Sequence, residues 1–132
     1  MPIPDFQSII LPLLQQFRDG KENSIQEVVG ELAKVYSLTE QEINELLPSG
    51  KQTTFYNRVG WARTYLSKSG LLEMPRRSYH KITARGKEVL KSNPARIDMK
   101  YLERFPEYVE FRERESARRK DQGDNDKDSA LQ

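Results

Sequence analysis

Apolar residues recur every three or four positions near the start of the chain, which is the period of an amphipathic helix. This first stripe runs from Phe6 to Phe17 and predicts a helix that Asp5 caps. Pro12 lies inside the stripe and has no N–H to donate, so we expect a kink or a restart of the helix there. The helix is expected to end at Asp19-Gly20.

Two capping-box patterns predict the next two helices. Ser24-Ile25-Gln26-Glu27 precedes an apolar face that continues to about Tyr36. Thr39-Glu40-Gln41-Glu42 repeats the pattern before a short helix whose apolar positions extend to Leu47. Pro48-Ser49-Gly50 then breaks the helix and turns the chain.

A fourth helix is predicted from about Thr53 to Ser69, where Gly70 ends it. Its apolar side consists of Phe55, Val59, Ala62 and Leu66. At about 100° per residue, the opposite side carries Thr53, Asn57, Gly60, Thr64 and Lys68, flanked by Trp61 and Thr54.

Two short strands and a closing helix follow. Residues 71–74 and 79–82 are strand candidates, and the intervening Pro75-Arg76-Arg77-Ser78 suits a hairpin with a cationic tip. Thr83-Ala84-Arg85-Gly86 opens another helix, which Ser92-Asn93-Pro94 closes. Four helices, a hairpin and a closing helix make the fold mainly α with a small β-hairpin. Successive helices followed by a hairpin and a closing helix are the order of a winged helix–turn–helix domain, here over residues 1–94.

The remaining chain divides into two parts. Residues 95–116 form an amphipathic helical extension that Pro106 divides, and it packs either back on the domain or onto another chain. Residues 117–132 have no apolar periodicity, which predicts a disordered polar tail.

Charge is distributed unevenly along the sequence. The net charge of the whole chain is only +2, but residues 51–91 hold ten Lys and Arg against two Glu, which gives +8. This basic segment coincides with the fourth helix and the hairpin, the two elements that contact DNA in a winged helix. A basic footprint of this kind indicates a polyanion as partner, and the alternative is a solvated basic face with no partner.

Composition excludes several function classes. The chain has no cysteine, so disulfides, thiolate catalysis and thiolate metal sites are ruled out. Its single histidine, His80, makes a histidine relay or a metal cage improbable, and we expect neither metal nor cofactor. No apolar run is long enough to span a bilayer, so a cytoplasmic protein without membrane contact is expected.

The fourth helix and the hairpin supply the candidate DNA-binding residues. Asn57 suits bidentate pairing with adenine. Gly60 allows close approach either to DNA or, more often, to a crossing helix, and Trp61 is more often a core plug than a base-stacking platform. The full candidate set is Lys51, Gln52, Thr53, Thr54, Asn57, Arg58, Thr64, Lys68, Arg76, Arg77 and Lys81.

Several motifs between residues 3 and 94 belong together. They are Pro4-x-Phe6-x-x-x-Ile10-x-Pro12-x-Leu14, Ser49-Gly50-Lys51, Asn57-Arg58-Val59-Gly60-Trp61-Ala62, Leu66, Gly70-Leu71 and Ile82-Thr83-x-x-Gly86. This set resembles the amino-terminal domain of Mrr-type restriction proteins. The resemblance implies a winged-helix DNA-targeting module that is joined, in that family, to a nuclease domain cutting foreign DNA with methylated bases.

The sequence departs from that family where the nuclease domain should follow. No strand pair with a metal-binding acidic residue and a Glu or Gln two positions before a Lys is found, so we expect no catalysis. Glu107, Glu110 and Glu113 have helical spacing and are better explained as solvated surface than as metal ligands.

Three functions therefore compete. The first is a non-catalytic module that binds double-stranded DNA, with methylated foreign DNA as a candidate target. It either works with a restriction nuclease, for which a separate subunit is the candidate partner, or is derived from one. The second is a winged-helix transcriptional regulator, which requires a homodimer, for which the C-terminal helix is a candidate interface. The third is a protein-interaction adaptor that docks through Tyr101, Phe105, Tyr108 and Phe111.

Overall fold

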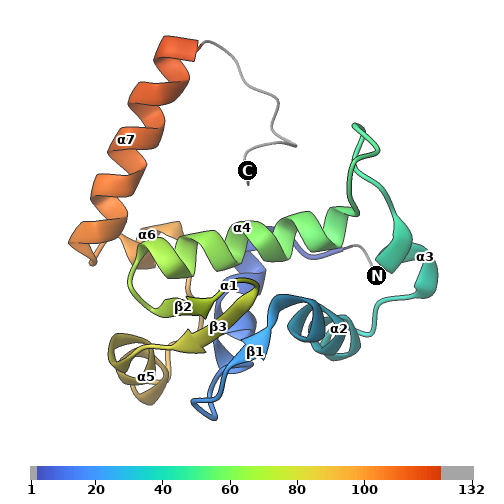
Figure 1. The fold of residues 1–132 in the computed structure, drawn as a ribbon, viewed down its shortest axis with the longest axis horizontal. Helices are drawn as coiled ribbons and strands as arrows, with labels where there is room; N and C mark the ends of the chain where they lie inside the picture. Colours follow the sequence, from blue (N-terminus) through green and yellow to red (C-terminus); the bar gives the residue numbers. More distant parts are fainter. Residues whose placement is uncertain (1–2, 123–132) are drawn as a thin grey trace.

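The computed structural model describes residues 3–122, although the side chains of residues 119–122 are not described. Seven helices and three strands are arranged around a central helix, α4 (Figure 1). In chain order they are α1 (Phe6–Gln15), β1 (Asn23–Ser24), α2 (Ile25–Val35), α3 (Glu40–Asn44), α4 (Thr54–Lys68), β2 (Leu72–Arg76), β3 (Tyr79–Ile82), α5 (Ala84–Lys91), α6 (Met99–Leu102) and α7 (Pro106–Gln122). The mainly α, winged-helix-like fold class is thereby confirmed.

The predicted caps start the helices as expected. The side chains of Asp5, Ser24 and Thr39 each accept a backbone N–H of the first turn, and Thr39 and Glu42 form a complete capping box. The third helix ends earlier than predicted, at Asn44, because the chain turns extended and Leu46 forms a β-bridge with Thr53.

The sheet has one strand more than predicted. The hairpin of β2 and β3 is present, and β1 pairs antiparallel with β3, giving the order β1-β3-β2. The pairing continues into the start of α2, where the Ile25 N–H donates to the Ser78 carbonyl. Because β1 is only two residues long and polar, it has no apolar alternation from which a strand could be predicted.

One hydrophobic core joins the N-terminal domain and the C-terminal extension. Ile97, Leu102, Tyr108 and Phe111 are buried in the same cluster as the apolar faces of α1, α2 and α4. Of the two alternatives, the extension therefore packs back on the domain. Tyr108 and Phe111 are 2% and 9% exposed, so the predicted adaptor surface is wrong for these two residues.

Pro106 divides the extension as predicted, and it is the first residue of α7. The helix then continues to Gln122, so the predicted polar tail does not begin at residue 117. Within this stretch Arg118 pairs with Glu115 one turn earlier, a contact that favours further helix. Residues 123–132, where we expected the rest of the tail, lie outside the described residues.

Pro12 lies within α1, which runs from Phe6 to Gln15 without interruption. A proline at this position leaves the carbonyl of Ser8, four residues earlier, without its helical donor. The Tyr36 hydroxyl, at the end of α2, donates to that carbonyl at 3.1 Å. A side chain from the second helix thus replaces the hydrogen bond that the proline removes.

Tyr36→Phe is expected to lower the free energy of unfolding by about 1 kcal/mol, because the half-buried Ser8 carbonyl loses its donor. Urea denaturation monitored by circular dichroism measures this change. Tyr56→Phe is the control, since Tyr56 is exposed and its hydroxyl makes no hydrogen bond within residues 3–122. Equal stability losses in both variants would contradict the role assigned to Tyr36.

Candidate nucleic-acid interface

Helix α4 carries five of the eleven predicted site residues and lies between the sheet and α7 (Figure 1). Its N-cap is Thr53, whose side chain accepts the Tyr56 N–H. The predicted apolar side is confirmed, because Phe55, Val59, Ala62 and Leu66 are at most 1% exposed. The helix is also covered on the side of Tyr65, which is in edge contact with Phe6, Tyr108 and Phe111.

Three of the predicted residues on α4 are held within the fold. Thr54 and Asn57 are only 6% and 5% exposed, and the Asn57 amide donates to Gln52 Oε1 at 2.9 Å. The Arg58 guanidinium donates to the carbonyls of Ile3 and Pro4 and so fastens the start of the chain to α4. These side chains reach a DNA base only if the groups around them move.

Trp61 packs against neighbouring rings. It is half-buried, and its ring lies 6.2 Å from that of Phe6 and 5.7 Å from that of Tyr65. These contacts agree with the interpretation of Trp61 as a packing residue between helices.

The remaining predicted residues of α4 and of the turn before it are more exposed to solvent. They are spread along the whole length of the helix. Lys51 is exposed at the turn before the helix, and Lys68 is exposed in its last turn, with Nζ 5.5 Å from the centre of the Phe111 ring. Gln52, Thr53 and Thr64 are half-buried between them. Because 15 residues of helix span about 22 Å, the two lysines cannot contact the same phosphate.

The hairpin brings three predicted cations together. Arg77 is exposed in the two-residue turn between β2 and β3, and Lys81 is exposed on β3. Arg76 stacks on Tyr79, with 3.9 Å between its guanidinium carbon and the ring centre, and pairs with Glu22 at 2.9 Å. Glu73 lies directly across the strands from Lys81. The outer face of the hairpin therefore carries both positive and negative charges, and Arg77 is the cation in the turn at its tip.

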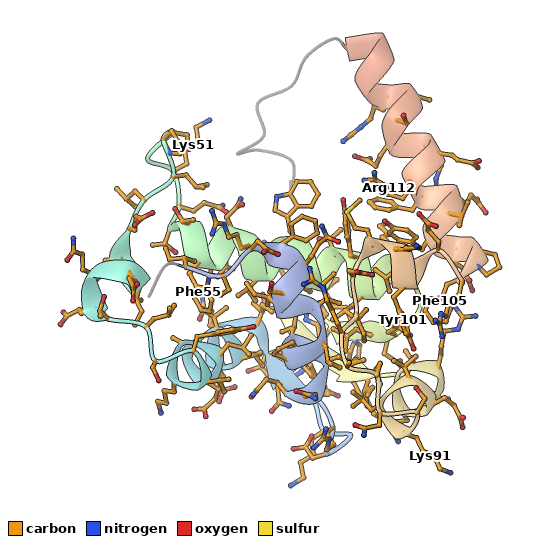
Figure 2. All side chains as sticks on the ribbon, turned by 180° about the vertical axis from the view of Figure 1, so that it is seen from behind. Lys51, Phe55, Lys91, Tyr101, Phe105 and Arg112 are labelled. Atoms are coloured by element: carbon orange, nitrogen blue, oxygen red, sulfur yellow. The ribbon has the colours of Figure 1, made fainter. Side chains whose placement is uncertain are left out.

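The ten basic residues of the +8 segment do not form one continuous surface. Figure 2 shows Lys51 and Lys91 at opposite ends of the molecule. Arg85 is also withdrawn from a common surface, because it pairs with Glu107 of α7 at 3.0 Å and with the Ser69 carbonyl. The hydrogen bond from Arg85 lowers the pKa of the Glu107 carboxyl below its ordinary value. The structure thus separates this segment into exposed and internally bonded cations.

Arg63 is a cation near the hairpin that the sequence-based candidate set does not contain. It is half-buried on α4 and lies close to His80 of β3, and the Nε of Arg63 and the Nδ1 of His80 are both buried without a hydrogen-bond partner. Burial, with a smaller contribution from the Arg63 charge, lowers the pKa of His80 to about 4. The sequence does place Arg63 among the ten basic residues of the +8 segment, one turn after Val59 and at the edge of the apolar side.

Within residues 3–122, no group of three or more Asp, Glu, His or Cys side chains is placed to hold a metal ion. No helix in the same range combines the length and apolar character that crossing a membrane requires.

A protein-family model matches residues 6–92, from the start of α1 to the end of α5, and its description is the Mrr N-terminal domain. The chain belongs to this family. The match confirms the resemblance seen in the motifs and makes the protein a component of an Mrr-like system. Helices α6 and α7 lie beyond the matched Mrr N-terminal domain, and no nuclease-domain model matches. Comparisons with curated proteins and with solved structures gave no match.

Proposed function

We propose that this Mrr N-terminal domain binds double-stranded DNA through the exposed side of α4 and the β2–β3 hairpin. The observation that carries the proposal is the presence, in a domain of a restriction family, of exposed cations on the two elements that approach DNA in a winged helix. Phosphate contacts dominate the affinity of such proteins. The contacting residues are Lys51, Gln52, Thr53, Thr64, Lys68, Arg76, Arg77 and Lys81.

The buried members of the predicted set have a supporting role in this proposal. Asn57 holds Gln52 and Arg58 holds the start of the chain, so both fix the shape of the surface that DNA meets. Thr54 is buried at the start of α4 and has no part in contacting DNA. The protein itself is non-catalytic in this proposal and directs an Mrr-like nuclease, supplied separately, to foreign DNA that carries methylated bases.

Affinity for a labelled duplex, measured by fluorescence anisotropy at several salt concentrations, tests the proposal. Four to five phosphate contacts predict a slope of log affinity against log salt between about −3.5 and −4.5. Arg77→Gln/Lys81→Gln is expected to weaken binding by about ten-fold or more and to make the slope shallower by about 2.

The matched control is Lys34→Gln/Lys91→Gln, which removes the same charge from exposed lysines outside α4 and the hairpin. It is expected to retain the wild-type slope. Absence of duplex binding by the wild-type chain at low salt contradicts the proposed function. A methylated and an unmethylated duplex of the same sequence, compared in this assay, test the choice of foreign DNA as target.

A further inference from the structure

Arg63 is the partly buried arginine that the fold leaves unpaired. Most other described arginines have a partner, such as the main-chain carbonyls around Arg58, Glu22 beside Arg76 and Glu107 beside Arg85. Within residues 3–122, Arg63 makes no hydrogen bond or ion pair, and its Nε is out of contact with solvent. The guanidinium is therefore partly desolvated without compensation.

His80, the neighbour of Arg63, adds to the free-energy cost of burying polar groups without partners. His80 is 2% exposed, it packs edge-on against the Phe17 ring, and its Nδ1 also lacks a partner. A buried polar group without a hydrogen bond destabilises a fold by about 1 to 3 kcal/mol. Two such groups near one another in a small domain need an explanation, and a functional role is one explanation for an unsatisfied group in a native structure.

The place of Arg63 supplies that reason. It lies on α4 near His80 of β3, so it belongs to one element of the proposed interface and is close to the other. The residue is half-buried and its Nε is out of contact with solvent, so part of the rotamer freedom that an arginine normally loses on binding is already lost. An arginine presents a rigid fork of donors that matches phosphate oxygens, or the O6 and N7 of guanine, in bidentate geometry.

We propose that Arg63 is a DNA-contacting residue, held by the surrounding fold at its buried Nε, and that its terminal nitrogens are left unpaired so that acceptor atoms of DNA complete their hydrogen bonds. This inference rests on the proposed function. It predicts that Arg63 contributes to DNA affinity at the expense of stability, which a structural arginine does not do.

The test compares Arg63→Met with Arg112→Met in the full chain, since both arginines are half-buried and only Arg112 has a hydrogen-bond partner within residues 3–122. Arg63→Met is expected to weaken duplex binding by about ten-fold or more while its thermal midpoint stays equal or rises. Arg112→Met removes the hydrogen bond to the Tyr65 hydroxyl, so it is expected to lower the midpoint and to leave the affinity of the folded protein close to that of wild type.

Salt dependence identifies the acceptor. A loss of affinity on all duplexes with a slope shallower by about 1 indicates a phosphate, and a loss confined to some sequences at unchanged slope indicates guanine. Arg63→Lys, which keeps the charge without the fork, is expected to bind between wild type and Arg63→Met.

Wild-type affinity in Arg63→Met, or a lower thermal midpoint of that variant, overturns the inference. If Arg63→Met fails either expectation but the hairpin variant Arg77→Gln/Lys81→Gln loses affinity in the same assay, only the inference about Arg63 is overturned. The proposed DNA-binding function then still stands. Failure of the wild-type chain to bind any duplex overturns both.

Discussion

Replacing Gly86 by alanine is expected to lower the free energy of unfolding by about 2 to 3 kcal/mol. Gly86 lies in the first turn of α5, where a Cβ would meet the Leu71 carbonyl oxygen and lie 2.6 Å from Cγ1 of Ile82. The carbonyl already accepts the Thr83 N–H and Ile82 is in the core, so neither can give way cheaply. The steric cost exceeds the gain of about 1 kcal/mol that alanine offers in a helix.

Gly30→Ala is the matched control, because this glycine lies within α2 and a methyl group added to it would have no atom within 4 Å. The stability of this variant is expected to rise by about 0.5 to 1 kcal/mol through helix propensity and a less flexible unfolded chain. Urea denaturation measures both variants. Stabilisation by Gly86→Ala would show that α5 can move away from the sheet, contrary to the close packing described above.

Stability is also expected to fall steeply as the pH is lowered, because His80 takes up a proton when the chain unfolds. The pKa of this group is about 4 in the folded protein, against an ordinary value of 6.5, so the unfolded chain binds the proton more tightly. The stabilisation is complete above pH 6.5, declines as the pH falls toward 4, and changes no further below that. Lowering the pH from 7.5 to 5 is expected to cost about 2 kcal/mol.

The comparison of wild type with His80→Gln and His80→Phe across this pH range isolates the effect, since the chain has one histidine. Both variants are expected to lose most of the dependence, and the phenylalanine keeps a ring against Phe17. Equal pH profiles in wild type and both variants would show that His80 does not titrate between the two states in this range.

The two proposals assign different tasks to the cations of α4 and the hairpin. Exposed groups such as Arg77 attract the phosphate backbone and determine the salt dependence. Arg63 is half-buried and oriented by the fold, which suits a contact of defined geometry. Affinity for DNA in general is therefore expected to depend on the hairpin, and the register of the complex on Arg63.

The C-terminal extension is part of the folded unit although it lies beyond the matched domain. Tyr108 and Phe111 of α7 pack on Tyr65 of α4, and Arg112 donates to the Tyr65 hydroxyl at 3.1 Å. Figure 2 shows Arg112 on α7 near the end of α4. The first turns of α7 are thus fixed to α4, the helix that we propose contacts DNA.

The helices follow from the amino-acid sequence alone, because their ends depend on local contacts. Caps at Asp5, Ser24, Thr39 and Thr53 bond to backbone groups three residues away, and such spacing is visible in one dimension. The apolar row of α4 that begins at Phe55 is predictable for the same reason. The family motifs and the basic character of residues 51–91 also require no structure.

Whether the polar side chains of α4 are exposed and free to bind a ligand, in contrast, depends on packing in three dimensions. Helical spacing predicts an exposed Asn57, but a helix covered on several sides buries more than its apolar row. The partners of Arg58 and Arg76 lie more than 50 positions away in the sequence, so no local sequence pattern predicts these contacts. The strand β1 and the proximity of Arg63 to His80 depend in the same way on segments that meet only after folding.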